Sequence, residues 1–391
     1  MRHFIMITLV VCIMLGMGSG AKAETLLEYQ PFQESIEAQL EALDLAQLLG
    51  FVELLEQDYQ DFLPSLNWRE LVSEGRNSRE PADLVAVVLK SLLRELYSSL
   101  YFLRQLVVIG ILAALLQRLS ESFGIKAVVE LAFAVCFLVL VLLGLQSFRI
   151  ASSVATASIG NMVEFMHSVL PMLATLLVAV GGITSATVFH PLLWGLVGTI
   201  ASLVRYLLLP LILMSTAFSL VAHFSSELSF PKVGSLLRQG VITVLGVAFI
   251  VFSGFMVVRG AIAPITDGIS LRTAKYLTRT FIPIAGGMFA DALEVVVGGS
   301  LLIKNAIGVF GLLMILFMVA TPLLKVWAMV LIYKLVGVLL EPICDRRIVA
   351  TLGTMESSLT LVAIALGTVA VMFFLAITIL VGIGNLAVFM R

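Results

Sequence analysis

Charged residues are scarce in this sequence. Only 13% of the 391 residues are Asp, Glu, Lys or Arg, 60% are hydrophobic, and the mean hydropathy is +1.09. An ordinary soluble domain has about one quarter charged residues, so this composition excludes a water-soluble protein. Because helices satisfy their own backbone polar groups in lipid, the sequence predicts an all-α fold, a polytopic transmembrane helix bundle.

The motifs of common enzymes are also absent. The sequence has no G-x-x-x-x-G-K-[ST] loop for nucleotide phosphates, no G-x-S-x-G nucleophile turn and no H-E-x-x-H zinc motif. The cysteines form no CxxC pair, and the histidines lack metal-ligand spacing. They are Cys12, Cys136, Cys344, His3, His167, His190 and His223. We therefore expect a non-enzymatic protein with no catalytic residue, cofactor or metal, and no nucleic-acid partner.

The few charges are unevenly divided along the chain. Residues 24–100 contain 15 acidic and 5 basic residues, whereas residues 101–391 contain 10 acidic and 17 basic ones. Apolar residues at helical spacing between Ile36 and Leu63 predict an amphipathic helix in the acidic part. We expect residues 24–100 to be a small helical head outside the cytoplasm and residues 101–391 to be the multi-spanning membrane domain.

The first 23 residues resemble an export signal. Arg2 precedes an apolar run from Phe4 to Met17, and Ala21-Lys22-Ala23 fits a small-residue cleavage site. We predict cleavage between Ala23 and Glu24. The alternative is an uncleaved signal anchor, although the apolar run is short for a span of about 20 residues.

The membrane domain contains apolar runs suited to crossing a bilayer. They centre on residues 101–117, 127–146, 166–183, 189–222, 240–258, 305–342 and 359–389. The run 189–222 contains Arg205 and Pro210 and is either one kinked crossing or two short ones. The run 305–342, with Pro322 and Lys325 at its centre, is interpreted as two spans.

Basic residues in cytoplasmic loops predict the orientation. If the head is exported, the first span runs inward, Arg118 and Lys126 lie in the cytoplasm, and the next connection, with Arg149 and Glu164, lies outside. A single crossing in 189–222 then places a larger basic group inside, and two crossings place it outside. This group is Arg259, Arg272, Lys275, Arg279, Arg346 and Arg347. The charge rule favours the single crossing.

Residues 261–305 form a charged, glycine-rich segment within the apolar domain. It contains Gly-Gly pairs at 286 and 298 and seven charges: Asp267, Arg272, Lys275, Arg279, Asp291, Glu294 and Lys304. Charges at membrane depth cost about 2.5–3.5 kcal/mol each and tend to face a partner, a bundle interior or water. We predict that these charges are functional; the alternative is an interfacial loop with solvated charges.

The stretch TDGISLRTAKYLTRTFIPIAGGMF, followed by SLLIKN, resembles the stage III sporulation protein AE family of endospore-forming bacteria. The similarity covers nearly the whole chain, including Phe189-His190-Pro191, Tyr333-Lys334-Leu335 and Gly384-Asn385-Leu386. Composition rather than residue order agrees in the acidic head.

The resemblance implies a function that the residues alone do not. Members of the family reside in the mother-cell membrane around the forespore, the outer forespore membrane. They join the other stage III sporulation A-operon proteins in a secretion-like channel complex, which meets stage II sporulation protein Q and supports forespore development and late forespore gene expression. The resemblance thus implies a membrane subunit of this channel complex. The alternative is a small-solute permease that uses residues 261–305 as its site, although no internal repeat of the kind common in transporters is evident.

Overall fold

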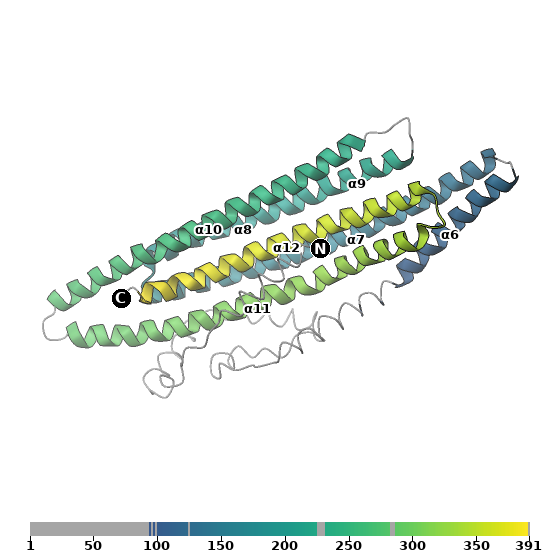
Figure 1. The fold of residues 1–391 in the computed structure, drawn as a ribbon. Coiled ribbons are helices and arrows are strands. Elements are labelled where there is room, and N and C mark those ends of the chain that lie inside the picture. Colours follow the sequence, from purple (N-terminus) through teal and green to yellow (C-terminus); the bar gives the residue numbers. More distant parts are fainter. Residues whose placement is uncertain are drawn as a thin grey trace.

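The computed structural model describes residues 100–123, 126–224, 231–281 and 286–389, together with Arg94 and Tyr97. The described chain is helical apart from short turns, which confirms the all-α prediction (Figure 1). The elements are α6 (Leu100–Phe123), α7 (Lys126–Ala179), α8 (Ile183–Ser202), η1 (Leu203–Leu208), α9 (Leu209–Phe224), α10 (Pro231–Phe281), α11 (Gly286–Leu340) and α12 (Arg346–Phe389). The predicted signal peptide, its cleavage site and nearly all of the acidic head lie outside these residues.

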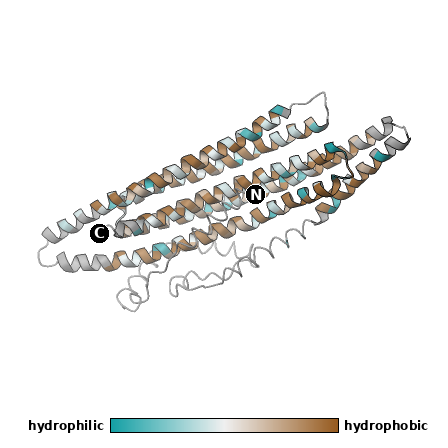
Figure 2. Cartoon of the chain, viewed as in Figure 1, coloured by the Kyte–Doolittle hydropathy of each residue, from teal (hydrophilic) through white to brown (hydrophobic). Residues whose placement is uncertain are grey.

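Five described helices are long and apolar enough to cross a membrane, which supports a multi-pass membrane protein. They are Ala134–Ala179, Ile183–His223, Lys232–Ile269, Val295–Leu340 and Arg346–Asn385, and a shorter apolar helix covers Phe102–Leu116. Hydrophobic residues occur along the whole length of these helices, with hydrophilic positions interspersed (Figure 2).

The helices lie side by side and alternate in direction (Figure 1). The α11–α12 turn and the ends of α6 and α9 lie at one end of the bundle, here called the Arg346 end. The α7–α8 turn and the end of α10 lie toward the other, called the Gly181 end. α12 runs through the core and packs against α7, α9, α10 and α11.

Short sequence signals mark the starts and ends of these helices. At the α7–α8 turn, Gly181 has a φ of 95° and Gly182 precedes α8, a backbone that favours glycine. At the α11–α12 turn, the Asp345 carboxylate accepts a hydrogen bond of 2.7 Å from the Arg347 N–H, as a helix N-cap does. Pro231 begins α10, a position where its missing N–H has no cost.

Residues 189–222 lie in one rod, as predicted for a single crossing. α8, η1 and α9 follow one another without a turn, and the Leu209 N–H bonds to the Val204 carbonyl five residues back. The wider turn comes directly before Pro210, which removes a donor from the helix ladder. Arg205 therefore lies on the wide turn.

Two predictions of the spans are wrong. Residues 305–342 form part of one helix, α11, with Pro322 inside it, because a proline in a long, packed helix removes one backbone bond without ending the helix. Residues 127–146 and 166–183 were expected to be separate spans, yet α7 continues from Lys126 to Ala179. The polar stretch between them is helix, not a loop.

The continuous α7 also corrects the predicted orientation. With one crossing fewer, Arg272, Lys275 and Arg279 near the end of α10 lie at the bundle end opposite Arg118. Arg346 and Arg347 begin α12 and lie at the same end as Arg118. The basic residues expected on one side of the membrane are thus divided between the two ends.

Candidate functional site

Of the seven charges predicted to be functional, the structure describes the side chains of Asp267 and Lys304. Asp267 is 1% exposed on α10. Its Oδ1 accepts the Ser185 N–H at 3.2 Å, and its Oδ2 accepts a short hydrogen bond from the Ser185 hydroxyl. Ser185 lies in the first turn of α8, where backbone N–H groups lack partners and favour an anion. Asp267 therefore caps α8 from a neighbouring helix.

Lys304 also holds two helices together. Its side chain, 1% exposed on α11, donates to the Val381 carbonyl at 2.7 Å and to Asn385 Oδ1 at 3.3 Å on α12. A Cβ at Gly384 would lie 1.9 Å from Lys304 Nζ, so glycine leaves the space that the ammonium occupies.

The other five charges are not tested. The side chains of Arg272, Lys275 and Arg279 on α10, and of Asp291 and Glu294 on α11, lie outside the described residues, as do Ala23 and Glu24 at the predicted cleavage site. The predicted role of this group stays a prediction.

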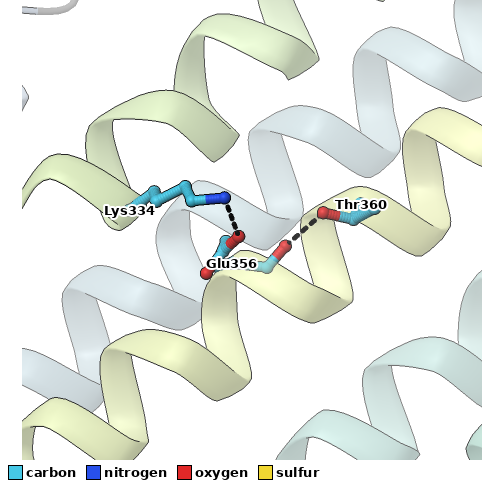
Figure 3. Close-up of polar contacts among 3 residues, drawn as sticks. All are labelled: Lys334, Glu356 and Thr360. Atoms are coloured by element: carbon cyan, nitrogen blue, oxygen red, sulfur yellow. Dashed lines mark hydrogen bonds and ion pairs between the residues drawn. The ribbon is translucent and has the colours of Figure 1, made fainter. Parts of the chain in front are cut away.

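A layer of polar contacts between helices crosses the bundle about two to three helical turns from the Arg346 end. Sequence reasoning missed this layer, which we call the polar level. Lys334 Nζ lies 3.9 Å from Glu356 Oε1, and Thr360 donates to the Glu356 carbonyl at 2.8 Å (Figure 3). Arg238 donates to Ser357 at 2.8 Å. Further bonds join Tyr333 to Ser147, His223 to Thr354 and Thr216 to Ser358. The sequence signal was the polar run Thr351–Thr360, which lies between the basic pair Arg346-Arg347 and the apolar run that begins at Leu361.

These contacts show which residues of different helices lie at the same position along the bundle axis. Ser147 on α7, Lys334 on α11, Ser357 on α12 and Arg238 on α10 are linked at the polar level. Nearer the Gly181 end, a second level is defined by close approaches to glycines. A Cβ on Gly311 would lie 3.3 Å from Ile377 and 3.8 Å from Val169, and one on Gly260 would lie 2.7 Å from Ile379. Residues 239–259 of α10 are therefore level with about residues 148–169 of α7.

On α10 this interval has the length of one bilayer crossing. Residues 239–258 contain no charge and lie between Arg238 and the exposed Arg259. They span about 30 Å at 1.5 Å per residue, which equals the hydrocarbon thickness. Large apolar side chains are exposed throughout: Ile242, Val244, Val247, Ile250, Val251, Val257 and Val258. We call the interval between the two levels the membrane layer.

A second exposed apolar area lies closer to the Arg346 end, on α6 and the first part of α7. It includes Val108, Leu115, Leu131 and Leu138. The apolar part of α6 is only Phe102–Leu116, about 22 Å of helix and too short for a hydrocarbon core. We therefore use the uncharged interval on α10 to define the membrane layer.

The face of α7 in the membrane layer is polar. Between Ile150 and Val178, α7 exposes no large hydrophobic side chain. Its exposed positions in this interval are Ser153, Ala157, Glu164, Pro171 and Thr175, and the half-exposed Gly160, Asn161 and Ser168 lie on the same side, flanked by other half-exposed residues that include Val154 and Val163. The spacing of the exposed positions places them on one side of a helix. We call these exposed positions, together with Gly160, Asn161 and Ser168, the α7 polar face.

Arg205 adds a positive charge beside this face. Its Nη1 lies 3.7 Å from the position of a Cβ on Gly160, and its Nε is buried without a hydrogen-bond partner. Neither Arg205 nor Glu164 forms an ion pair in the described part of the chain. One turn farther along, the His167 ring stacks on Trp194 with centroids 4.6 Å apart.

This arrangement suits contact with water or protein better than contact with lipid. A guanidinium and a carboxylate at membrane depth are costly when lipid surrounds them, whereas a guanidinium binds carboxylates or phosphates well in a low-dielectric setting. Among the described residues, no group of three or more His, Cys, Asp or Glu could hold a metal ion.

Comparison with known proteins agrees with the resemblance found in the sequence. The family model for stage III sporulation protein AE matches residues 66–384. A curated relative, stage III sporulation protein AE of Bacillus subtilis (strain 168), is 33% identical over 336 residues, which are 85% of this chain and 84% of the relative. No solved structure matches. With a family match over most of its length and a relative of this similarity, the chain belongs to the stage III sporulation protein AE family.

Proposed function

We propose that this sporulation protein is a non-enzymatic membrane subunit of the channel complex between mother cell and forespore. It would reside in the mother-cell membrane around the forespore, and its partners would be the other stage III sporulation A-operon proteins and, through the complex, stage II sporulation protein Q. In this role it supports forespore development and late forespore gene expression.

The α7 polar face is the observation that carries the proposal. At the depth where α10 exposes only uncharged, largely apolar residues, α7 exposes Ser153, Ala157 and Glu164 beside Arg205. Water or protein covers such a face at lower cost than lipid does. A subunit that lines or supports a conduit has this two-sided character, with lipid on one side and the complex on the other.

The small-solute permease is less well supported. Its proposed site was residues 261–305, and the two charges described there, Asp267 and Lys304, are both bound to neighbouring helices. Neither is free to bind a solute unless it first gives up these partners.

Substitution of the polar face tests the proposal. Ser153→Leu with Ala157→Leu would make the face apolar, and we expect normal membrane accumulation with a block in forespore development. The matched control is Val247→Ser with Val251→Ser on α10, at the same depth, which should sporulate nearly normally. Heat-resistant spore counts and a late forespore reporter measure the outcome. Parental sporulation of the α7 variant would refute the proposed role of this face.

A further inference from the structure

The α7 polar face carries opposite charges at neighbouring depths. Arg205 lies beside Gly160, and Glu164 follows Gly160 by four residues, about one helical turn or 6 Å. Glu164 is exposed and Arg205 half-buried, and neither has an ion-pair partner among the residues the structure describes. One chain therefore presents an acid and a base side by side without pairing them.

Copies of a membrane protein share one orientation in the bilayer. Two copies related by an axis along the membrane normal bring residues of equal depth together. In such a pair, Glu164 of each copy comes within about one turn of the depth of Arg205 in the other. The patch formed by Glu164 and Arg205 on one copy is thus complementary in charge to the same patch on the other copy.

The shape of the face permits close approach. Ser153, Ala157 and Gly160 are small, and small residues let membrane helices pack closely. Within the membrane layer the face runs from Ser153 to Ser168, about 22 Å, which is most of the thickness of the hydrocarbon core. A second copy on this face would remove its polar groups from lipid along most of the crossing.

We propose that a second copy of this chain docks on the α7 polar face, with Glu164 of one copy paired to Arg205 of the other. The inference rests on the proposed function in one respect, namely that protein or water rather than lipid covers this face. It adds the identity of the partner and the two residues that align it.

Cysteine cross-linking in native membranes tests the contact. In a chain with Cys12→Ala, Cys136→Ser and Cys344→Ser, we introduce Ala157→Cys and oxidise the membranes. A disulfide forms only when the two Cα atoms approach to about 4.4–6.8 Å, so we expect a product of twice the chain mass. Val247→Cys, exposed on α10 at a similar depth, is the matched control and should give little product.

Charge exchange tests the pairing. Added to Ala157→Cys, either Glu164→Arg or Arg205→Glu alone places like charges together and should lower the cross-link yield by about tenfold. The two single variants are then expressed in one cell as differently tagged chains. Each supplies the charge that the other lacks, so the mixed cross-link should return. If Glu164 and Arg205 acted only within one chain, mixing the two variants would not restore the cross-link yield.

Each outcome decides the inference. Equal cross-linking at Ala157 and Val247 would overturn it, as would failure of the mixed pair to recover. A cross-linked product with a chain of different mass would also overturn self-association, yet would leave the proposed function intact. If the chain self-associates as expected but the variants of the α7 polar face sporulate normally, the proposed function is refuted and the self-association is not.

Discussion

α7 and α10 pass through the same membrane layer with opposite surfaces. α10 exposes Val247, Val251 and Val258, whereas α7 exposes Ser153, Ala157 and Glu164. Both helices are continuous at this depth, so the difference lies in their exposed side chains and not in their backbone. Low local hydropathy in a membrane protein can therefore mark a polar helix face instead of a loop.

The largest expected effect comes from placing a charge on each face. Val251→Asp on α10 puts a carboxylate into lipid, at a cost of about 2.5–3.5 kcal/mol, and should sharply lower the membrane-inserted fraction. Ala157→Asp lies at nearly the same depth on the α7 polar face and should insert well. Immunoblots of washed membranes measure both. Equal loss in the two variants would show that the faces have the same surroundings.

The second test compares a bound carboxylate with an exposed one. Asp267→Ala leaves the Ser185 N–H and hydroxyl without their acceptor, and a buried polar group left unpaired costs about 1–3 kcal/mol. Glu164→Ala removes an exposed carboxylate, and the change should stay within about 0.5 kcal/mol in the detergent-solubilised monomer. Thermal unfolding of both variants measures the difference. Similar destabilisation by the two would contradict the assigned roles.

The smallest effect concerns the turn beyond the membrane layer, at the Arg346 end. Burial, and then the negative charge of Asp345, raise the pKa of the Cys344 thiol above its ordinary value. The thiolate is the reactive form, so in a chain with Cys12→Ala and Cys136→Ser, alkylation should be slow near neutral pH. Its rate should rise only at higher pH than for a free thiol.

Asp345→Asn isolates the charge in this last test. Asparagine retains the ability to cap α12, while its neutral side chain no longer raises the pKa of Cys344. Alkylation at a given pH should become modestly faster. An unchanged pH profile would show that Asp345 does not act on the thiol.

Much of the fold could be predicted from the sequence. Composition alone predicted a multi-spanning helical protein. Residues 189–222 form the single rod that was favoured, although the basic residues on which that choice rested lie at both ends of the bundle. The errors arose where a local signal was taken as a break. Pro322 lies buried within α11, and the exposed polar residues Arg149, Ser153 and Glu164 lie along one side of the continuous α7.

The candidate site was less accessible to sequence reasoning. Charge density drew attention to residues 261–305, yet Asp267 and Lys304 make contacts with residues 82 and at least 77 positions away. The α7 polar face required knowing which residues of α7 and α10 lie at one depth. That register comes from contacts such as Arg238 with Ser357, which no local pattern contains. The polar run Thr351–Thr360, by contrast, was visible in the sequence.

The length of the rods has a mechanical consequence. α11 has 55 residues and α12 has 44, so they extend for about 80 and 65 Å, more than twice the thickness of the hydrocarbon core. A stiff rod held at the bilayer acts as a lever. A tilt of about 5° about its middle moves each end of α11 by about 3.5 Å, roughly the diameter of a methyl group. Small rotations at membrane depth are thus transmitted to both ends of the bundle at once.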